Sequence, residues 1–549
     1  MSVLSRLFDR FLGLPKATTP AIEVTRGLDV PMPDGVVLSA DRYRPRGAGP
    51  LPVVLVRTPY GKHQLLSKGI AGVLARRGMQ VVVQDTRGTF GSGGRFSAFH
   101  QERDDGLATA AWLREQPWCD GKLAMTGASY LGYTQWAVGP YLDPPLEAMC
   151  LGITASEFTT SFYPGGVLAL HNMLTWAALI GTQEEARLGG LLPDPRRQRR
   201  LRRAMAHVPI STSDVAAIGK EVPFLREVTG HAEPGDDFWS GTEHNSALAK
   251  LSTPTSMVTG WWDLFLPAQL RDFAALREAG RHSRIVIGPW GHDLDAIRAL
   301  LIDQVSWLSA HLLDGPTPTN RSPVRLYLQR AGRWLDFDRW PPAQSTPTSL
   351  YLLPHRGLGW ESPPDGSASA TFTYDPAHPT RSSGGPLLDV RQSKQRDNRQ
   401  TELRSDVLVY TGQPLPRDLD LVGPVTATVY VRTDTGHADL FVRLCDVDLA
   451  GVSRNVTDGI VRLPSETGEV KVEVELHPTG YRFKLGHRLR VQVAGGAFPR
   501  FARNHGTGEP VGRAVRTRTT RFEVFQDAGR PSMLTLPVLD DDAPTPDNH

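Results

Sequence analysis

The chain has 549 residues, with 61 Lys and Arg against 58 Asp and Glu, and a formal net charge of +3. Single hydrophobic cores stop growing at about 250–300 residues, so we expect two or three domains. The near balance of charge argues against a polyanion binder, and therefore against nucleic acid as a partner. The only cysteines, Cys119, Cys150 and Cys445, contain no Cys-x-x-Cys pair. This argues against a disulfide framework or a zinc cluster and favours a reducing, cytoplasmic location.

The first sixteen residues, MSVLSRLFDRFLGLPK, lack the continuous apolar run of a signal peptide. Their apolar residues recur with helical spacing, which predicts a short amphipathic helix lying on the body of the protein. Contact of this helix with a membrane surface is the alternative. No run in the chain approaches the 18 apolar residues that indicate a membrane-spanning helix.

The first third of the chain alternates between short apolar runs and segments with helical spacing. We predict strands over residues 51–56, 79–85 and 122–129, and helices over residues 64–78, 107–116 and 131–139. Continuous apolar strands separated by helices indicate a parallel sheet that is covered on both faces.

From about residue 156 to 249 the pattern changes to helices and loops. A helix is expected over 168–190, and the segment 193–208 that follows holds six arginines. We interpret that segment as a solvated helix face rather than a nucleic-acid site, because one basic helix in a near-neutral protein is weak evidence. The α/β pattern then resumes, with strands at 253–263 and 283–293 and a helix at 296–315.

The stretch PPAQSTPT at residues 341–348 reads as a linker. After it, four segments alternate between apolar and other residues with a period of two: 425–434, 439–447, 468–476 and 487–496. Regular short strands of this kind predict a β-sandwich or jelly roll. The acidic, proline-containing tail at 540–549 is expected to be disordered.

The strongest motif is Gly127-Ala128-Ser129-Tyr130-Leu131-Gly132, which lies where an apolar strand turns into a helix. A nucleophile elbow needs this context, since the sharp turn lifts the serine hydroxyl above the sheet. The spacing differs by one residue from the common G-x-S-x-G pattern. An ordinary glycine-rich strand–helix turn is the alternative interpretation.

A serine nucleophile needs a base, and the base needs a carboxylate to orient it. Asp263 ends one predicted strand and His292 follows the next. The order Ser, Asp, His is that of α/β-hydrolases, and the carboxyl ends of parallel strands are where active sites of open sheets gather. We therefore expect hydrolysis of an ester or amide through an acyl-enzyme on Ser129, without a metal or cofactor.

The oxyanion of such a reaction needs two hydrogen-bond donors. One is expected to be the backbone N–H of Tyr130, the residue after the nucleophile. The other is expected from the loop 57–62, where the Tyr60 hydroxyl is the candidate. Alternatively, Tyr60 packs as a half-buried aromatic ring and a backbone N–H of the same loop serves.

Several stretches together resemble one known family. They are VRTPYGK, QDTRGTFGSGGRF, WLREQPWCDGKLAMTGASYLG, TGWWDLF, IGPWGH, ADLFVRLCDVDLAG, LGHRLRVQVAGGAFPRFARN and SMLTLPV. These matches, which run from about residue 25 to 538, resemble the cocaine esterase / X-prolyl dipeptidyl-peptidase family of serine hydrolases. That family includes α-amino-acid ester hydrolases and glutaryl acylases.

The resemblance implies an α/β-hydrolase domain with an inserted helical cap, followed by a C-terminal all-β jelly-roll domain. The implied segments are 1–155 and 250–344 for the hydrolase domain, 156–249 for the cap and 345–549 for the jelly roll. The resemblance also implies a triad of Ser129, Asp263 and His292, an oxyanion hole of Tyr60 and Tyr130, and a structural Asp–Arg pair in the turn 85–88.

The substrate is less clear from the sequence. Trp176, Trp262 and Phe265 are candidates for an apolar acyl pocket, although each also reads as a core residue. Asp236 and Asp237 suit an α-ammonium group, but surface charge on the cap is the preferred reading. We expect a carboxylesterase or acylase acting on a small molecule, and a homo-oligomer is possible. An X-Pro dipeptidyl-peptidase, an α-amino-acid ester hydrolase and a non-catalytic binding scaffold are the alternatives.

Overall fold

The computed structural model describes residues 13–14, 16–19, 21–185, 195–233, 235–313, 315 and 322–540. Its N-terminal half is built on one ten-stranded sheet with the order β1-β2-β4-β3-β5-β6-β7-β8-β9-β10. The strands are β1 Ile22–Pro31, β2 Val37–Pro45, β3 Leu51–Thr58, β4 Gln80–Asp85, β5 Cys119–Ala128, β6 Ala148–Gly152, β7 Thr255–Trp262, β8 Ser283–Gly291, β9 Val324–Leu328 and β10 Arg333–Phe337. The helix expected over residues 1–16 falls almost entirely outside the described residues.

The centre of this sheet is parallel, as predicted, but its edges are not. Strands β4, β3, β5, β6, β7, β8 and β9 pair in parallel, whereas β1, β2 and β10 are antiparallel additions. The sequence analysis did not find β1 and β2, whose many polar residues break the apolar run. It also did not find β6, which has only five residues.

Helices cover both faces of the sheet because the strand side chains alternate between two apolar cores. In β3, Val53 and Leu55 enter one core, while Val54 and Val56 enter the other. The first core lies under α3 Glu102–Arg114 and α10 Leu266–Glu278, and the second lies under α2 Leu65–Ala75 and α11 Leu294–Leu312. The short helix α4 Tyr130–Trp136 follows β5.

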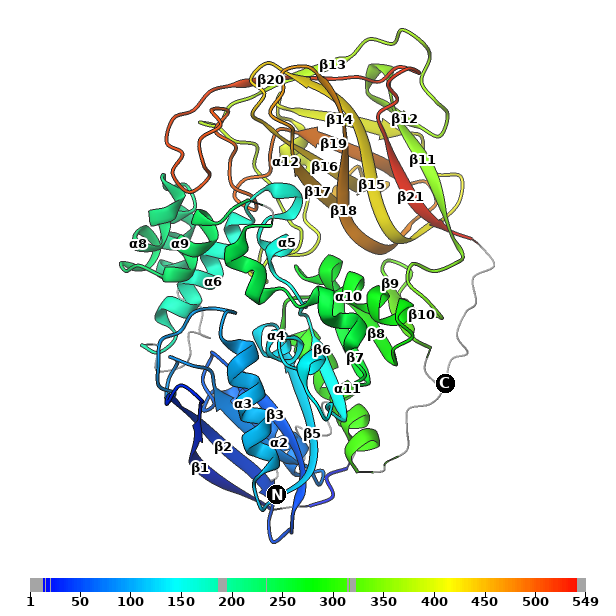
Figure 1. The fold of residues 1–549 in the computed structure, drawn as a ribbon. Helices are drawn as coiled ribbons and strands as arrows, with labels where there is room; N and C mark the ends of the chain where they lie inside the picture. The colour runs from blue at the N-terminus through cyan, green and yellow to red at the C-terminus, as the bar shows by residue number, and fades with distance from the viewer. Residues whose placement is uncertain are drawn as a thin grey trace.

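A helical insertion separates β6 from β7. Its helices are α5 Thr159–Phe162, α6 Leu170–Thr182, α7 Pro195–Ala204, α8 Ser213–Ile218 and α9 Pro223–Gly230. Their apolar side chains share a core with Tyr130 and Tyr133 of α4. The insertion therefore packs beside the strand–helix turn that carries Ser129, between the sheet and the β domain (Figure 1).

The C-terminal part is all β, as predicted, and forms an eleven-stranded sheet system around its own apolar core. Its strands are β11 Ser345–Leu353, β12 Gly357–Gly359, β13 Ala370–Tyr374, β14 Val407–Gly412, β15 Leu419–Thr433, β16 Asp439–Val447, β17 Ser453–Arg462, β18 Glu469–Phe483, β19 Arg488–Ala494, β20 Thr520–Val524 and β21 Met533–Leu539, with the short helix α12 Arg399–Glu402. This confirms the fold class, an α/β domain followed by a β domain of jelly-roll type.

The predicted linker is too long at its C-terminal end. Residues 345–348 are not linker but the first residues of β11, and they pair with β21 from Ser345 onward. The prolines and threonines of this stretch suggested an irregular segment. Pro347 is tolerated in the strand, where it lies opposite Pro537 of β21.

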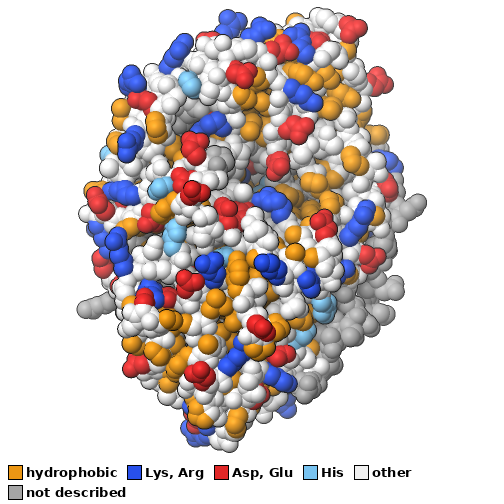
Figure 2. Space-filling model, viewed as in Figure 1, with side chains coloured by type: hydrophobic (Ala, Val, Ile, Leu, Met, Phe, Trp, Pro, Cys, Tyr) orange, Lys and Arg blue, Asp and Glu red, His pale blue; other side chains and the backbone are white. Residues whose placement is uncertain are grey.

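The charged side chains of the surface are mixed in sign. Figure 2 shows acidic and basic groups interspersed over the viewed face rather than gathered into one field. No helix within the described residues is long and apolar enough to cross a membrane.

Candidate active site

The turn between β5 and α4 places Ser129 in a strained conformation. Its backbone φ of 57° and ψ of −125° lie outside the regions that residues other than glycine normally adopt. The turn is possible because Gly127 and Gly132 carry no Cβ. A Cβ at Gly127 would lie 2.4 Å from Leu131, and one at Gly132 would lie 2.4 Å from Thr154. The second close approach explains why position 132 is a glycine.

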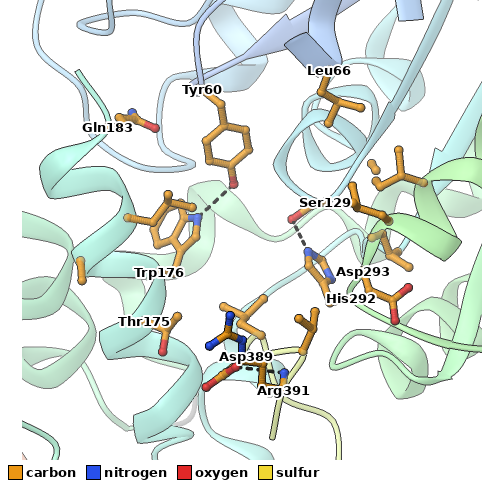
Figure 3. A pocket seen from close by; sticks show the side chains of 18 of the residues that line it. Tyr60, Leu66, Ser129, Thr175, Trp176, Gln183, His292, Asp293, Asp389 and Arg391 are labelled. Carbon is orange, nitrogen blue, oxygen red and sulfur yellow. Dashed lines mark hydrogen bonds between the residues drawn. The ribbon is translucent and has the colours of Figure 1, made fainter. Parts of the chain in front are cut away.

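The structure brings Ser129, His292 and Asp263 together. Nε2 of His292 lies 3.1 Å from Oγ of Ser129 (Figure 3). Nδ1 of His292 lies 2.7 Å from Oδ2 of Asp263. Asp263 is fully buried, and its Oδ1 accepts the backbone N–H of Phe265 at 2.8 Å. All three residues follow neighbouring or near-neighbouring parallel strands, namely β5, β7 and β8. The arrangement can activate a hydroxyl for attack on a carbonyl group.

Tyr60 lies in the loop after β3 with its hydroxyl directed towards the space beside Ser129 (Figure 3). Burial raises the pKa of Tyr60 to about 12, against the opposing effect of hydrogen bonds with Trp176 and Ser129. Nε1 of Trp176 donates to the Tyr60 oxygen at 3.0 Å. Tyr130 is the first residue of α4, so its N–H is one of the helix donors without an intrahelical acceptor.

A buried polar network that the sequence analysis missed holds Tyr130. The Tyr130 hydroxyl donates to Glu102 at 2.9 Å and accepts the backbone N–H of Phe99 at 2.9 Å. Arg57 pairs with Glu102 at 2.9 Å. Burial raises the pKa of Glu102, although Arg57 opposes that shift. The partners come from β3 and α3, so no local sequence signal connects them to the nucleophile motif.

The Asp–Arg pair that the resemblance implied in the turn 85–88 does not form. Asp85 instead binds Lys62, with Oδ2 at 2.6 Å from Nζ. Arg87 pairs with Asp105 of α3 at 2.5 Å and with Asp34 at 2.6 Å. The reason is topological, because β3 and β4 are parallel neighbours and the loop after β3 abuts the end of β4. Asp85 therefore fastens the loop that carries Tyr60.

A cavity of about 600 Å³ opens beside the triad. Ser129, His292, Tyr60 and Trp176 line it, together with parts of α2, α6, α7 and α11 and the segment 388–392 of the β domain. The basic helix predicted within 193–208 thus contributes one face of α7 to the cavity and is not solvated all round.

Two of the three aromatic residues proposed for the acyl pocket do not line this cavity. Trp262 is buried at the end of β7, where its indole N–H donates to Gln329 at 2.8 Å. Phe265 stacks on Phe158 of the cap with ring centroids 4.3 Å apart, and it makes a T-shaped contact with the His292 ring. Both residues are therefore buried packing residues beside the site and do not line the cavity.

The acidic pair of the cap also lies away from the cavity lining. Asp236 caps the short helix Asp237–Thr242 by accepting the N–H of Phe238 at 2.9 Å, and it pairs with His231 at 3.1 Å. Asp237 is exposed. Within the described residues, no cluster of three or more His, Cys, Asp or Glu side chains is arranged to hold a metal ion.

Known proteins match the chain over nearly its whole length. The family model for X-Pro dipeptidyl-peptidase (S15 family) matches residues 34–293, and that for the X-Pro dipeptidyl-peptidase C-terminal non-catalytic domain matches residues 318–535. A cocaine esterase of Rhodococcus sp. (strain MB1 Bresler) is 31% identical over 575 aligned positions, which cover 94% of this chain and 98% of that protein.

Two solved structures share the fold. An aminopeptidase from the marine sediment archaeon Thaumarchaeota archaeon superposes with a TM-score of 0.81 at 22% identity, covering 96% of this chain and 99% of that one. An α-amino-acid ester hydrolase superposes with a TM-score of 0.79, also at 22% identity, covering 96% and 98%. The resemblance found in the sequence is confirmed: the chain is a serine hydrolase and belongs to the cocaine esterase / X-Pro dipeptidyl-peptidase family.

Proposed function

We propose that this enzyme is a carboxylesterase or acylase that works through an acyl-enzyme on Ser129. The observation that carries the proposal is the chain of hydrogen bonds from Asp263 through His292 to Ser129. Ser129 and His292 line the cavity. His292 takes the proton of the serine hydroxyl as Oγ attacks the substrate carbonyl, and Asp263 holds the imidazole in the tautomer that this requires.

The tetrahedral oxyanion then receives hydrogen bonds from the Tyr60 hydroxyl and the Tyr130 N–H. Collapse of this intermediate breaks the bond to the leaving alcohol or amine, which takes its proton from His292. Water enters, gives a proton to His292 and attacks the acyl-enzyme, and a second collapse releases the carboxylic acid and regenerates Ser129.

The cavity favours this proposal over an enzyme that anchors a substrate ammonium group. Of the two carboxylates in its lining, Asp293 is paired with Lys394 at 2.8 Å. The other, Asp389, accepts the backbone N–H of Arg391 at 3.0 Å and the side-chain amide of Gln392 at 2.6 Å. An X-Pro dipeptidyl-peptidase or an α-amino-acid ester hydrolase is the second candidate, since the family and the shared fold include such enzymes.

We further propose a small-molecule substrate and a cytoplasmic location. All three cysteines are free, and Cys150 and Cys445 are buried, which suits a reducing compartment.

The test is a serine-directed fluorophosphonate combined with a substrate panel. Wild-type enzyme should gain one adduct on the peptide that contains Ser129, and Ser129→Ala should gain none. Wild-type enzyme should hydrolyse neutral p-nitrophenyl esters faster than X-Pro or aminoacyl anilides. Faster turnover of the anilides would favour the second candidate, and labelling of a different residue would contradict the assignment of Ser129.

A further inference from the structure

The catalytic cavity has two sides with different chemistry. One side is aliphatic and comes from α2, α4, α11 and the end of β6: Leu66, Ile70, Leu131, Ile153, Leu300 and Leu301. The other side comes from α6, α7 and the segment 388–392, and it carries most of the charged groups. In Figure 3, Leu66 lies above the Ser129–His292 pair, whereas Thr175 and Arg391 lie below it.

The charged side has an excess of positive charge. Apart from the catalytic His292 and Tyr60, the titratable side chains in the lining are His171, Arg197, Arg202, Asp293, Asp389 and Arg391. Burial lowers the pKa of His171 to about 4, so this imidazole is neutral. Asp293 is neutralised by Lys394. Among the described lining residues, three arginines then stand against one carboxylate, an excess of two positive charges, with Arg202 and Arg391 exposed to solvent and Arg197 half-buried.

Arg197 is the arginine whose surroundings point most clearly to a ligand. It is half-buried on α7, and its Nη2 donates to the carbonyl oxygen of Ala178 at 3.0 Å and to Oγ1 of Thr182 at 2.8 Å. Both acceptors are uncharged groups of α6. Within the described residues, no carboxylate forms an ion pair with Arg197. A guanidinium facing an apolar cavity is costly unless an anion pairs with it.

Unpartnered polar atoms lie on the adjacent face of α6. His171 is 2% exposed, and its Nδ1 has no hydrogen-bond partner in the described part of the chain. Oγ1 of Thr175, one helical turn further along, is also without one. Both residues line the cavity. Buried polar atoms are normally hydrogen-bonded, so these two atoms suit a polar group of a bound ligand.

We propose that this side of the cavity is an anion subsite centred on Arg197, and that the preferred substrates are esters or amides bearing a carboxylate. The aliphatic side receives the apolar part of the substrate, and Arg391, which also lines the cavity, adds attraction for the anion. A cationic substrate is disfavoured by the same charges. The proposal rests on the hydrolase function proposed above and names the substrate class of that site.

The test compares esters that differ only in one charge. In the first pair, the acyl part carries the carboxylate: p-nitrophenyl hydrogen glutarate against its neutral methyl ester. In the second pair, the leaving group carries it: the acetate of p-hydroxyphenylacetate against the methyl ester of that compound. In at least one pair, kcat/KM of the anionic member should exceed that of the neutral member by about tenfold or more, the size expected for one hydrogen bond to a charged group.

Arg197→Gln should lower that ratio by about tenfold, because it removes the charge but keeps a polar side chain of similar length. Arg200→Gln is the matched control: this exposed arginine lies on the same helix but does not line the cavity, so the ratio should not change. Added salt should lower the ratio of the wild-type enzyme, a measurement that does not depend on the folding of a variant.

Equal or faster turnover of the neutral members of both pairs by wild-type enzyme would overturn the anion subsite. So would a preference for esters bearing an ammonium group, or an Arg197→Gln variant that loses activity on both members equally. If wild-type enzyme hydrolyses neither member and Ser129 takes no phosphonate, the hydrolase proposal itself fails. If the neutral esters are hydrolysed and Ser129 is labelled, only the anion subsite fails.

Discussion

Tyr60 owes its proposed role as a donor to Trp176. An indole N–H can only donate, so the phenol oxygen is the acceptor in that 3.0 Å hydrogen bond and its own proton remains available. The cap residue Trp176 thereby orients the hydroxyl towards the space beside Ser129. The sequence could suggest Tyr60 by its position after a strand, but the indole that orients it lies 116 residues away.

Tyr60→Phe should lower kcat by about 10²–10³, because a donor that acts on charge developed in the transition state is lost. KM for a neutral ester and the melting temperature should change little, because the ring remains. Tyr163→Phe is the control, since that hydroxyl donates to the carbonyl of Val228 within the cap at 2.7 Å and does not line the cavity. A normal kcat for Tyr60→Phe would contradict the donor role of Tyr60 and would favour a backbone N–H of the loop 57–62 as the donor.

The raised pKa of Tyr60 also predicts the alkaline behaviour. An acid whose pKa is raised to about 12 keeps its proton up to that pH, so the phenol remains a donor throughout the range from pH 7 to 10. The pH profile of kcat/KM should therefore show no loss of activity from pH 7 to about pH 10 through ionisation of Tyr60. A loss of activity between pH 8 and 10 would contradict the donor role of Tyr60.

The turn from β5 to α4 could be predicted from the sequence, because the residues of its motif are consecutive in the chain. What the sequence did not reveal is the partner of that turn: the hydroxyl of Thr154, which follows β6, donates to the carbonyl oxygen of Ser129 at 2.8 Å. The methyl group of the same threonine occupies the place that a Cβ at Gly132 would need. The turn therefore depends on the short strand β6, which sequence patterning missed.

Gly132→Ala should displace Thr154, lower kcat/KM by more than tenfold and destabilise the protein by about 1–3 kcal/mol, as overpacking commonly does. Gly69→Ala in α2 is the matched control, because a Cβ there meets nothing within 4 Å. That change should be neutral or stabilising by up to about 1 kcal/mol, since alanine favours the helix. Chemical denaturation and ester kinetics on both variants would check this. An active, stable Gly132→Ala enzyme would contradict the steric account of the motif.

Sequence patterning predicted strands β3, β4, β5, β7 and β8 and the covering helices α2, α3 and α11 because local apolar periodicity determines them. The sequence analysis placed Trp262 in the acyl pocket wrongly. At the end of a strand, the direction in which a side chain points depends on partners that are distant in the sequence. Gln329, which binds Trp262, also donates through its backbone N–H to the carbonyl of Gly480 in β18. The cavity-lining segment 388–392 was likewise not predicted, since no local pattern reports a contact between domains.

The β domain supports the active site at the scale of the whole molecule. Asp458 of β17 is buried between Arg443 of β16, at 2.9 Å, and Arg500. The carbonyl oxygen of Arg500 accepts the backbone N–H of His171 at the start of α6. Lys394 reaches from the same domain to Asp293, the residue after His292. The cavity wall and the His292 loop are therefore held from outside the hydrolase domain.

Asp458→Ala should destabilise the protein by about 3–5 kcal/mol, because it leaves two buried guanidinium groups without their carboxylate. Burial would raise the pKa of Asp458, but Arg500 and Arg443 outweigh it and lower the pKa below its ordinary value. Its contribution to stability is therefore present at neutral pH and is lost as the pH falls below the ordinary aspartate range.

Asp397→Ala is the control for that experiment, since it breaks an exposed pair with Arg399 and should change the stability little. Denaturant titrations of both variants at neutral pH measure the difference. Equal stabilities for the two variants would show that the buried cluster does not hold the domain together.

The central claim is that the acyl group of the substrate becomes covalently attached to Ser129. Mass spectrometry of the enzyme during turnover tests this claim most directly. Enzyme mixed with a neutral p-nitrophenyl ester and quenched in acid during turnover should carry one added acyl group on the peptide that contains Ser129. The Ser129→Ala variant should carry none and should release no p-nitrophenol above background. Turnover by wild-type enzyme with the acyl group on another residue, or persistent turnover by Ser129→Ala, would contradict the account.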